Sequence, residues 1–223
     1  LVLADYLARN GIASLRYDDR GVGSSQGDFE TVTTMTNMED AAAALAYIRT
    51  LKKFGKVGVV GHSEGGTISL MLAARGKADF IVDMSGFAIR GDSVAIDQVK
   101  AKCYLHGMPD SVATQAIADF DKIDLPWFKF AKTFNPSNDI KAIKCPVMAI
   151  AGTKDINVNP EHNQAALKRL LPFNSKNIIK KYEGLNHYLQ HCTTGGEEEM
   201  VHITETISPE VLKDIVTWIN RIK

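Results

Sequence analysis

The sequence predicts an α/β fold, with a mainly parallel sheet covered by helices on both faces. Short apolar runs alternate with segments of helical period along most of the chain, which is the pattern of repeated βα units. The 223 residues are 45% hydrophobic and 23% charged, so one sizeable core can be built. A glycine-flanked serine within residues 61–65 joins one apolar run directly to a helical segment. We therefore expect one domain with that serine at an edge of the sheet.

Apolar runs bounded by turn residues predict the strands in chain order. The expected strands cover residues 12–17, 57–60, 79–84, 146–151 and 177–182. A polar, glycine-rich loop over residues 18–27 follows the first of them. All five lie in the same alternating pattern, so their carboxyl ends should meet at one edge.

Helical periodicity and capping residues predict the intervening helices. The first covers residues 1–10 and ends at Gly11, and a capping-box pair, Thr36 and Glu39, precedes the second, which stops near Gly55. Further helices are expected over residues 66–75, over 159–171 and from Ser208-Pro209 onward. The apolar face of the last helix consists of Leu212, Ile215, Trp218, Ile219 and Ile222.

Residues 87–135 break the βα rhythm and are rich in aromatic side chains, so we interpret them as a helical lid. The expected organisation is a first core part over residues 1–86, the lid over 87–135 and a second core part over 136–223. Two interpretations of the lid aromatics stay open: they line an acyl pocket, or they form the small core of the lid itself. The aromatics concerned are Trp127, Phe128, Phe130 and Phe134.

Ser63 is the candidate nucleophile, because a strand that turns at once into a helix strains its turn residue and lifts the hydroxyl clear of both elements. Gly61 and Gly65 are expected on steric grounds, since side chains there would collide where strand and helix cross. The unpaired N–H of Glu64 at the helix start is the candidate oxyanion donor. The alternative is an ordinary serine in a glycine-flanked turn.

Two further residues complete a catalytic set in the expected chain order. Asp155 follows the strand at 146–151, and His187 follows the strand at 177–182. Because parallel strands bring their carboxyl ends to one edge, both side chains should reach Ser63. The order serine, aspartate, histidine is one of the known orders of serine hydrolase triads.

Other residues compete for these roles. Asp155 has an alternative interpretation as an aspartate that only caps its loop, in which case Asp83, which also lies near a strand end, is the main substitute as the acidic member. The competitors of His187 are His62, His191 and His202. A zinc site formed by His187, His191 and Cys192 is a further alternative if that stretch is helical.

With these residues in place, the chain resembles the α/β-hydrolase superfamily, most closely bacterial serine esterases and peptidase-like hydrolases with a small lid. The resemblance is carried by the loop Tyr17–Ser25, the Ser63 elbow, the loop Gly152–Asp155 and the pair Asn186-His187. It implies a hydrolase that cleaves carboxylic esters of small to medium acyl groups through an acyl-enzyme, with a small-molecule substrate and no metal or organic cofactor. An aminopeptidase or acyl transferase with the same triad, or a non-catalytic binding protein of the same fold, remain the alternatives.

The resemblance also predicts that strands are missing before residue 1. In similar proteins a central strand lies between those expected at 12–17 and 57–60, and the loop after it supplies a second oxyanion donor. Without that strand the sheet would have a gap with unpaired backbone groups. Residues 1–223 alone are therefore expected not to fold, and soluble material that melts cooperatively would contradict this.

Bulk composition disfavours several other classes of function. Lys plus Arg equals Asp plus Glu at 26 each, so the charge balance shows no signature of nucleic-acid binding. No apolar run approaches the roughly 20 residues that span a bilayer. Cys103, Cys145 and Cys192 are too few for a disulfide framework, which slightly favours a reducing compartment without deciding between cytoplasm and periplasm. The oligomeric state is not predicted.

Overall fold

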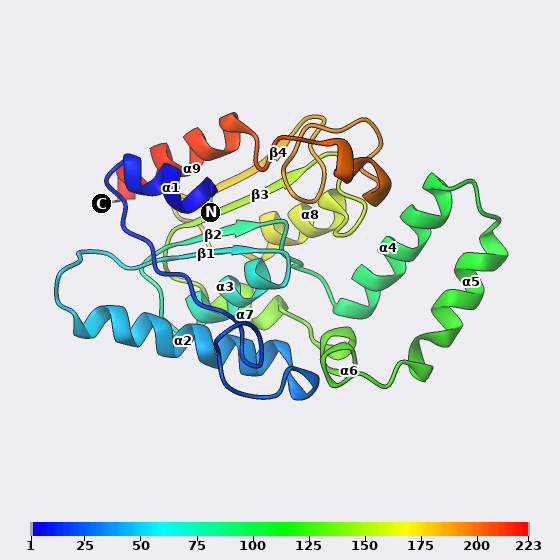
Figure 1. The fold of residues 1–223 in the computed structure, drawn as a ribbon, viewed down its shortest axis with the longest axis horizontal. Helices are drawn as coiled ribbons and strands as arrows, with labels where there is room; N and C mark the ends of the chain where they lie inside the picture. Colours follow the sequence, from blue (N-terminus) through cyan, green and yellow to red (C-terminus); the bar gives the residue numbers. More distant parts are fainter. Residues whose placement is uncertain (1, 223) are drawn as a thin grey trace.

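The computed structural model describes residues 2–222, so the predicted helix start at Leu1 lies outside the described residues. Its centre is a parallel sheet with the strand order β1-β2-β3-β4 (Figure 1). The strands are β1 Val59–His62, β2 Ile81–Met84, β3 Val147–Gly152 and β4 Ile178–Tyr182. The predicted α/β class and four of the five predicted strands are confirmed.

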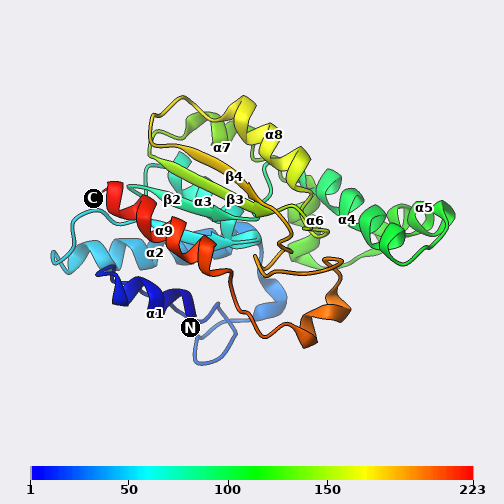
Figure 2. The ribbon, with the colours of Figure 1, turned by 90° about the horizontal axis from the view of Figure 1, so that it is seen from above.

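Helices cover both faces of this sheet (Figures 1 and 2). One face carries α1 Val2–Arg9 and α9 Pro209–Ile222. The other carries α3 Glu64–Ala74, α7 Ser137–Ala142 and α8 Pro160–Leu170, and α2 Thr34–Thr50 packs against α3. Residues 2–222 also contain three short 3-10 helices: η1 Phe29–Thr31, η2 Asp119–Lys122 and η3 Glu197–His202.

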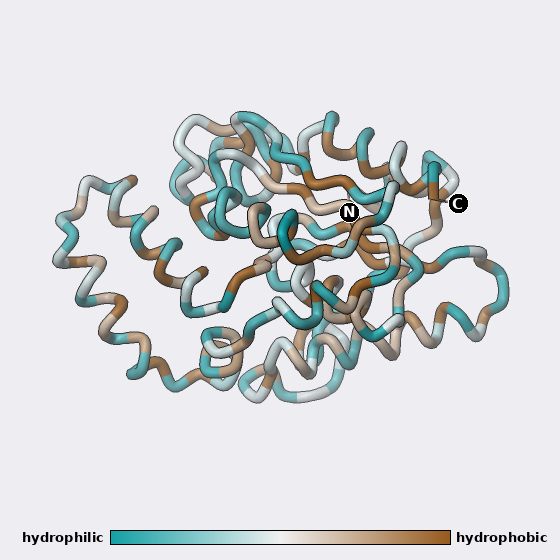
Figure 3. Tube along the Cα trace, turned by 180° about the vertical axis from the view of Figure 1, so that it is seen from behind, coloured by the Kyte–Doolittle hydropathy of each residue, from teal (hydrophilic) through white to brown (hydrophobic). Residues whose placement is uncertain are grey.

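The core follows from the alternation of side chains along each strand. In β2, Val82 and Met84 pack under α9, whereas Ile81 points to the α3 side. The predicted apolar face of α9 is confirmed, since all five of its residues are buried. Figure 3 shows the hydrophobic strands in the middle of the molecule, between helices of mixed polarity. The sheet is thus held between two apolar layers, and only its edges and ends face outward.

Residues 91–133 form the predicted helical segment. It contains α4 Gly91–Leu105, α5 Asp110–Ala118, η2 and α6 Pro126–Thr133. Figures 1 and 2 both show α4 and α5 extending away from the sheet, whereas α6 returns toward α2. Among the described residues, no helix combines the length and apolarity needed to cross a bilayer.

The strand predicted over residues 12–17 is wrong, because this segment is irregular. A segment forms a β-strand only when it is hydrogen-bonded to a neighbouring strand. No described strand lies beside β1 on the side away from β2, which is the side that residues 12–17 face. A cavity of about 440 Å³ separates Leu15 and Tyr17 from β1 instead. We call this cavity the β1 groove; it runs along the free edge of β1 as far as Ser63 and Gly65.

The predicted start of the second helix is also wrong. Its capping box consists of Thr33 and Thr36, whose side chains and backbone N–H groups pair reciprocally, and the helix begins at Thr34. Glu39 lies within the helix and takes no part. Threonine in place of glutamate at the third helical position hid the box, because the usual pattern has Glu or Gln there.

Candidate active site

Ser63 lies between β1 and α3 in the strained conformation that the sequence predicts. Its φ of 55° and ψ of −120° are rare for a residue with a side chain. The Ser63 N–H donates to the carbonyl oxygen of Met84 at 2.8 Å, which ties the turn to the end of β2. The strain is therefore supported by the sheet, as it often is at functional sites.

The two glycines that flank Ser63 differ in whether the structure leaves room for a side chain. A Cβ on Gly61 would lie 1.9 Å from the carbonyl oxygen of Gly65, so strand and helix approach too closely for any side chain. At Gly65 an added Cβ meets no atom of the described structure within 4 Å. The steric prediction is confirmed for Gly61 and wrong for Gly65, because Gly65 faces the open β1 groove.

The first turn of α3 offers backbone donors beside the serine. The carbonyl oxygen of Ser63 accepts from Gly66 and Thr67, at 2.9 and 3.2 Å. The earlier N–H groups, at Glu64 and Gly65, have no acceptor within the helix. Ser63, Glu64 and Gly65 all line the β1 groove, so these groups adjoin open space in which an anionic oxygen can be bound.

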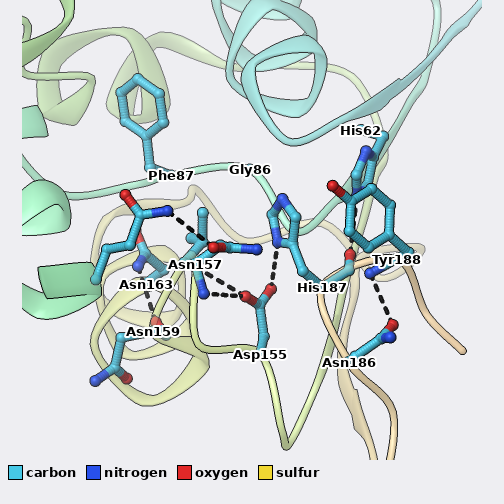
Figure 4. A network of polar contacts seen from close by, with 12 residues as sticks. His62, Gly86, Phe87, Asp155, Asn157, Asn159, Asn163, Asn186, His187 and Tyr188 are labelled. Carbon is cyan, nitrogen blue, oxygen red and sulfur yellow. Dashed lines mark hydrogen bonds and ion pairs between the residues drawn. The ribbon is translucent and has the colours of Figure 1, made fainter. Parts of the chain in front are cut away.

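Asp155 and His187 are both buried, and Figure 4 shows their side chains pointing toward each other. Nδ1 of His187 lies 2.8 Å from Oδ2 of Asp155, and the Asp155 side chain has no exposed area. The other carboxylate oxygen accepts from the N–H groups of Asn157 and Val158, at 2.9 and 2.8 Å. A carboxylate can only accept, so Nδ1 of His187 carries the proton and Nε2 is left as the basic atom.

The loops that carry this pair are in direct contact. A Cβ on Gly152 would lie 2.1 Å from the carbonyl oxygen of Leu185, so only glycine permits the approach at the end of β3. The Lys154 N–H donates to that same oxygen at 2.9 Å. Asn186 is buried, and its side-chain oxygen accepts from the N–H groups of Tyr188 and Gln190. Each loop therefore fixes the other.

His62 holds the histidine loop from the side of the elbow. Its Nε2 lies 2.8 Å from the carbonyl oxygen of His187, and the two rings are 4.7 Å apart at an angle of 51°. Since a carbonyl oxygen only accepts, Nε2 of His62 is the donor. Burial lowers the pKa of His62, which keeps the ring neutral. The sequence singled out His62 only as a competitor of His187, and its bond to residue 187 had no sequence signal.

The three predicted catalytic residues are thus gathered to different degrees. Asp155 and His187 are hydrogen-bonded, and Ser63 follows directly on His62, whose ring contacts His187. Within residues 2–222 the Ser63 hydroxyl makes no hydrogen bond to the His187 ring. Such contacts are often long in structures without substrate and tighten only in the complex.

The competing residues have other partners. Asp83 is buried beneath α3, where its carboxylate accepts from the Gly86 N–H at 2.8 Å and burial raises its pKa to about 7. His191 pairs with Glu205 at 3.0 Å, and His202 is exposed in η3. His187 and His191 therefore turn to different carboxylates, so the zinc alternative finds no common centre there, and no group of three potential ligands occurs within residues 2–222.

The aromatic residues predicted to bind substrate divide into two groups. Phe128 packs against Phe120 at 5.6 Å within the α4–α6 segment, and Phe130 stacks at 5.6 Å on Phe134, which lies just after α6 and joins it to the core. Trp127 instead donates its indole N–H to Oε1 of Glu64 at 2.5 Å. That side-chain role of Glu64 was missed, because the sequence drew attention only to its backbone.

Comparison with known proteins finds similarity to proteins named as hydrolases. A family model described as serine aminopeptidase, S33, matches residues 2–108. The chain is 26% identical over 229 residues to esterase EstD of Thermotoga maritima, with 95% of this chain and 54% of the relative covered. The chain therefore spans about half the length of the curated relative that it matches.

Solved structures share the architecture. A monoacylglycerol lipase of Paleococcus ferrophilus has a TM-score of 0.65 at 18% identity, covering 100% of this chain and 88% of that one. The esterase Pf2001 of Pyrococcus furiosus has a TM-score of 0.63 at 17% identity, covering 97% and 73%. Est1E of Butyrivibrio proteoclasticus, solved with ferulic acid, has a TM-score of 0.62 at 22% identity, covering 96% and 80%.

The layered parallel sheet and these neighbours define the class: the protein has an α/β-hydrolase fold. Within that class the chain resembles esterases, as the sequence predicted.

Proposed function

We propose that the protein is a serine hydrolase that cleaves carboxylic esters of small to medium acyl groups through an acyl-enzyme intermediate. Ser63 is the nucleophile, His187 the general base, Asp155 the residue that orients the base, and the Glu64 N–H one oxyanion donor. Residues 87–135 act as a lid between the core parts 1–86 and 136–223. The relatives named as esterases support ester hydrolysis by a protein of this fold.

The buried Asp155–His187 pair is the observation that carries the proposal. An aspartate without exposed area, with all its oxygens satisfied, stabilises the positive charge that the imidazole acquires when it takes a proton. The same hydrogen bond holds the ring in the tautomer whose Nε2 is basic. A structural ion pair would not need to lie beside a strained serine at a helix start.

The reaction follows from these positions. The Ser63 oxygen attacks the acyl carbon as its proton passes to Nε2 of His187, and the carbonyl oxygen, now negative, binds at the start of α3. The tetrahedral intermediate collapses when that proton moves to the departing alcohol, which leaves the acyl group on Ser63. Water then attacks the acyl carbon and gives a proton to His187, the bond from the acyl carbon to the Ser63 oxygen breaks as His187 returns that proton to the oxygen, and the acid is released. Hydrolysis by this route balances without metal or redox chemistry.

One observation favours a second candidate. The family model that matches residues 2–108 is described as serine aminopeptidase, S33. An aminopeptidase with the same triad differs only in what the pocket accepts, because the chemistry of acyl transfer is common to both. Substrate comparison separates the two.

The test is labelling with a fluorophosphonate, followed by identification of the modified residue. We expect modification of Ser63 and its loss in Ser63→Ala, which should also lower ester hydrolysis by roughly four to six orders of magnitude. p-Nitrophenyl esters of rising chain length are assayed beside amino-acid anilides. Label on another residue would refute the assignment of Ser63, and rapid anilide cleavage without ester turnover would replace esterase by aminopeptidase.

A further inference from the structure

The carboxylate of Glu64 joins three helices at one point beside the serine elbow. Its Oε1 accepts from the Thr34 hydroxyl and from the Trp127 indole N–H, both at 2.5 Å. Its Oε2 lies 3.5 Å from Nδ2 of Asn37. Thr34 and Asn37 belong to α2, Glu64 begins α3, and Trp127 lies in the first turn of α6.

The core side of this junction is buried and lies at a capped helix start. Thr34 has no exposed area, and it is the first residue of a helix closed by a capping box. Glu64 stands at the start of α3, where the helix dipole favours a negative side chain. Hydrogen bonds to an ionised carboxylate are roughly twice as strong as those between neutral groups. The carboxylate is therefore a fixed acceptor for whatever α6 presents to it.

The α6 side is held at its far end by different contacts. The carbonyl oxygen of Phe134, just after α6, accepts from the Gly91 N–H at 3.0 Å, and the Phe134 ring packs edge-on against Phe87 at 6.3 Å. At the near end, Trp127 is 40% exposed, and its bond to Glu64 is the only hydrogen bond from an α6 side chain to α3 within the described residues. At the near end, the link from α6 to α3 by side-chain hydrogen bonding is therefore lost with that one bond.

We propose that Glu64 is a positioning residue that holds Trp127, and with it the near end of α6, beside the elbow, so that the pair limits the size of the acyl group reaching Ser63. This proposal rests on the proposed function and adds a specificity determinant to it. Glu64 then has two roles: its backbone N–H binds the oxyanion, and its side chain sets the position of α6. Loss of the contact should widen access without removing the nucleophile.

The experiment uses the intact protein and two single variants, Trp127→Phe and Glu64→Ala, with their double variant. Trp127→Phe removes the N–H donor and keeps an aromatic ring. The control is Tyr104→Phe, because Tyr104 is an aromatic residue of α4 that is 89% exposed and its hydroxyl makes no hydrogen bond among the described residues. The assay is the ratio of kcat/KM for p-nitrophenyl decanoate to that for p-nitrophenyl acetate.

We expect this ratio to rise about tenfold in each single variant, the factor that a hydrogen bond to a charged group supplies. The double variant should show the same rise and no further one, since both changes break one contact. Tyr104→Phe should leave the ratio unchanged. An unchanged ratio in Trp127→Phe and Glu64→Ala, or a double variant that multiplies the two effects, overturns the proposal.

Tryptophan fluorescence provides a readout that does not depend on turnover. The protein has two tryptophans, and Trp218 is 3% exposed in the core, so acrylamide quenches mainly Trp127. Acrylamide is neutral, so loss of the charge at Glu64 does not by itself alter its access. Glu64→Ala should raise the quenching constant of the unliganded protein, and an unchanged constant contradicts the contact.

The two proposals fail separately. If fluorophosphonate still labels Ser63 in the Glu64 and Trp127 variants while the chain-length ratio and quenching do not change, the hydrolase stands and the positioning role falls. If quenching responds but the label is not on Ser63, the Glu64–Trp127 contact exists, and the specificity role falls together with the proposed function.

Discussion

His62 donates its Nε2–H to the carbonyl oxygen of His187 at 2.8 Å, so the residue before the elbow serine supports the loop that carries the imidazole. The strand that positions Ser63 thereby also positions His187. The His62 ring also packs against two rings of that loop, with its centroid 4.7 Å from the His187 ring and 5.4 Å from the Tyr188 ring. Positional accuracy at this site therefore depends on a side chain that takes no part in the proposed proton transfer.

Replacing His62 by alanine should lower kcat more than it changes KM. The carbonyl oxygen of His187 would lose its donor, and an unsatisfied buried group costs about 1–3 kcal/mol. We expect roughly a tenfold or greater loss of kcat, with partial rescue in His62→Gln, whose amide can donate to the same oxygen. Steady-state kinetics on p-nitrophenyl acetate test this, and equal rates in all three proteins would contradict it.

The same residue should contribute a pH dependence of stability. Burial lowers the pKa of His62 below its ordinary value of 6.5, so the unfolded state binds the proton more readily. Its stabilising contribution is complete above pH 6.5 and is lost as the pH falls through the lowered value. Between pH 8 and pH 5 the Tm should therefore decrease less in His62→Gln than in the original protein. An equal decrease of Tm in both proteins would show that His62 does not titrate in this way.

Asp155→Asn should remove most activity while the fold persists. The side-chain oxygen of asparagine can still accept from the N–H groups of Asn157 and Val158, so the loop keeps its bonds. Its NH₂ group would then face Nδ1 of His187 and favour the tautomer whose Nε2 is protonated. A fall in kcat of about 10³–10⁴ is expected, with an unchanged circular dichroism spectrum. A fall of less than tenfold would remove Asp155 from its role.

Gly61 and Gly65 form a matched pair for testing the elbow. Gly61→Ala places a methyl group 1.9 Å from a backbone oxygen, so overpacking should destabilise the protein by about 1–3 kcal/mol or more and distort Ser63. Gly65→Ala meets nothing within 4 Å in the described structure, and alanine favours a helix by about 1 kcal/mol. Urea unfolding compares the two; similar losses in both variants would contradict the difference.

Asp83→Asn should stabilise the protein at alkaline pH. Burial raises the pKa of Asp83 to about 7, so its favourable contribution is present below the ordinary value of 3.8 and is lost as the pH rises through about 7. Asparagine keeps an acceptor for the Gly86 N–H and never ionises. The difference in Tm between variant and original protein should grow from pH 5 to pH 8, and a constant difference would refute the titration of Asp83.

The sequence predicted those parts of the fold whose signals are local. Alternating apolar runs located β1 to β4, and Asn159-Pro160 marked the start of α8, where the Asn159 side chain accepts from two backbone N–H groups. The chain order of Ser63, Asp155 and His187 predicted the pairing of Asp155 with His187, because parallel strands end at one edge.

Features that depend on distant partners were not predictable in this way. Residues 12–17 have the composition of a strand, but pairing requires a neighbour that local composition does not reveal. The contacts of His62 with His187 and of Glu64 with Trp127 join residues 125 and 63 positions apart. Their residue types carry no pattern, so only the folded chain discloses them.

The free edge of β1 also has a consequence for aggregation in solution. Val59 donates its N–H to the carbonyl oxygen of Phe80 on the β2 side, whereas Val60, the next residue, turns its amide and carbonyl groups toward the β1 groove; β1 carries no proline or lysine of the kind that commonly protects such an edge. Extended polypeptide of almost any origin can dock there by backbone hydrogen bonding. A concentrated preparation of residues 1–223 alone should consequently turn cloudy through intermolecular β-pairing, and a stable clear solution would mean that another segment occupies this margin.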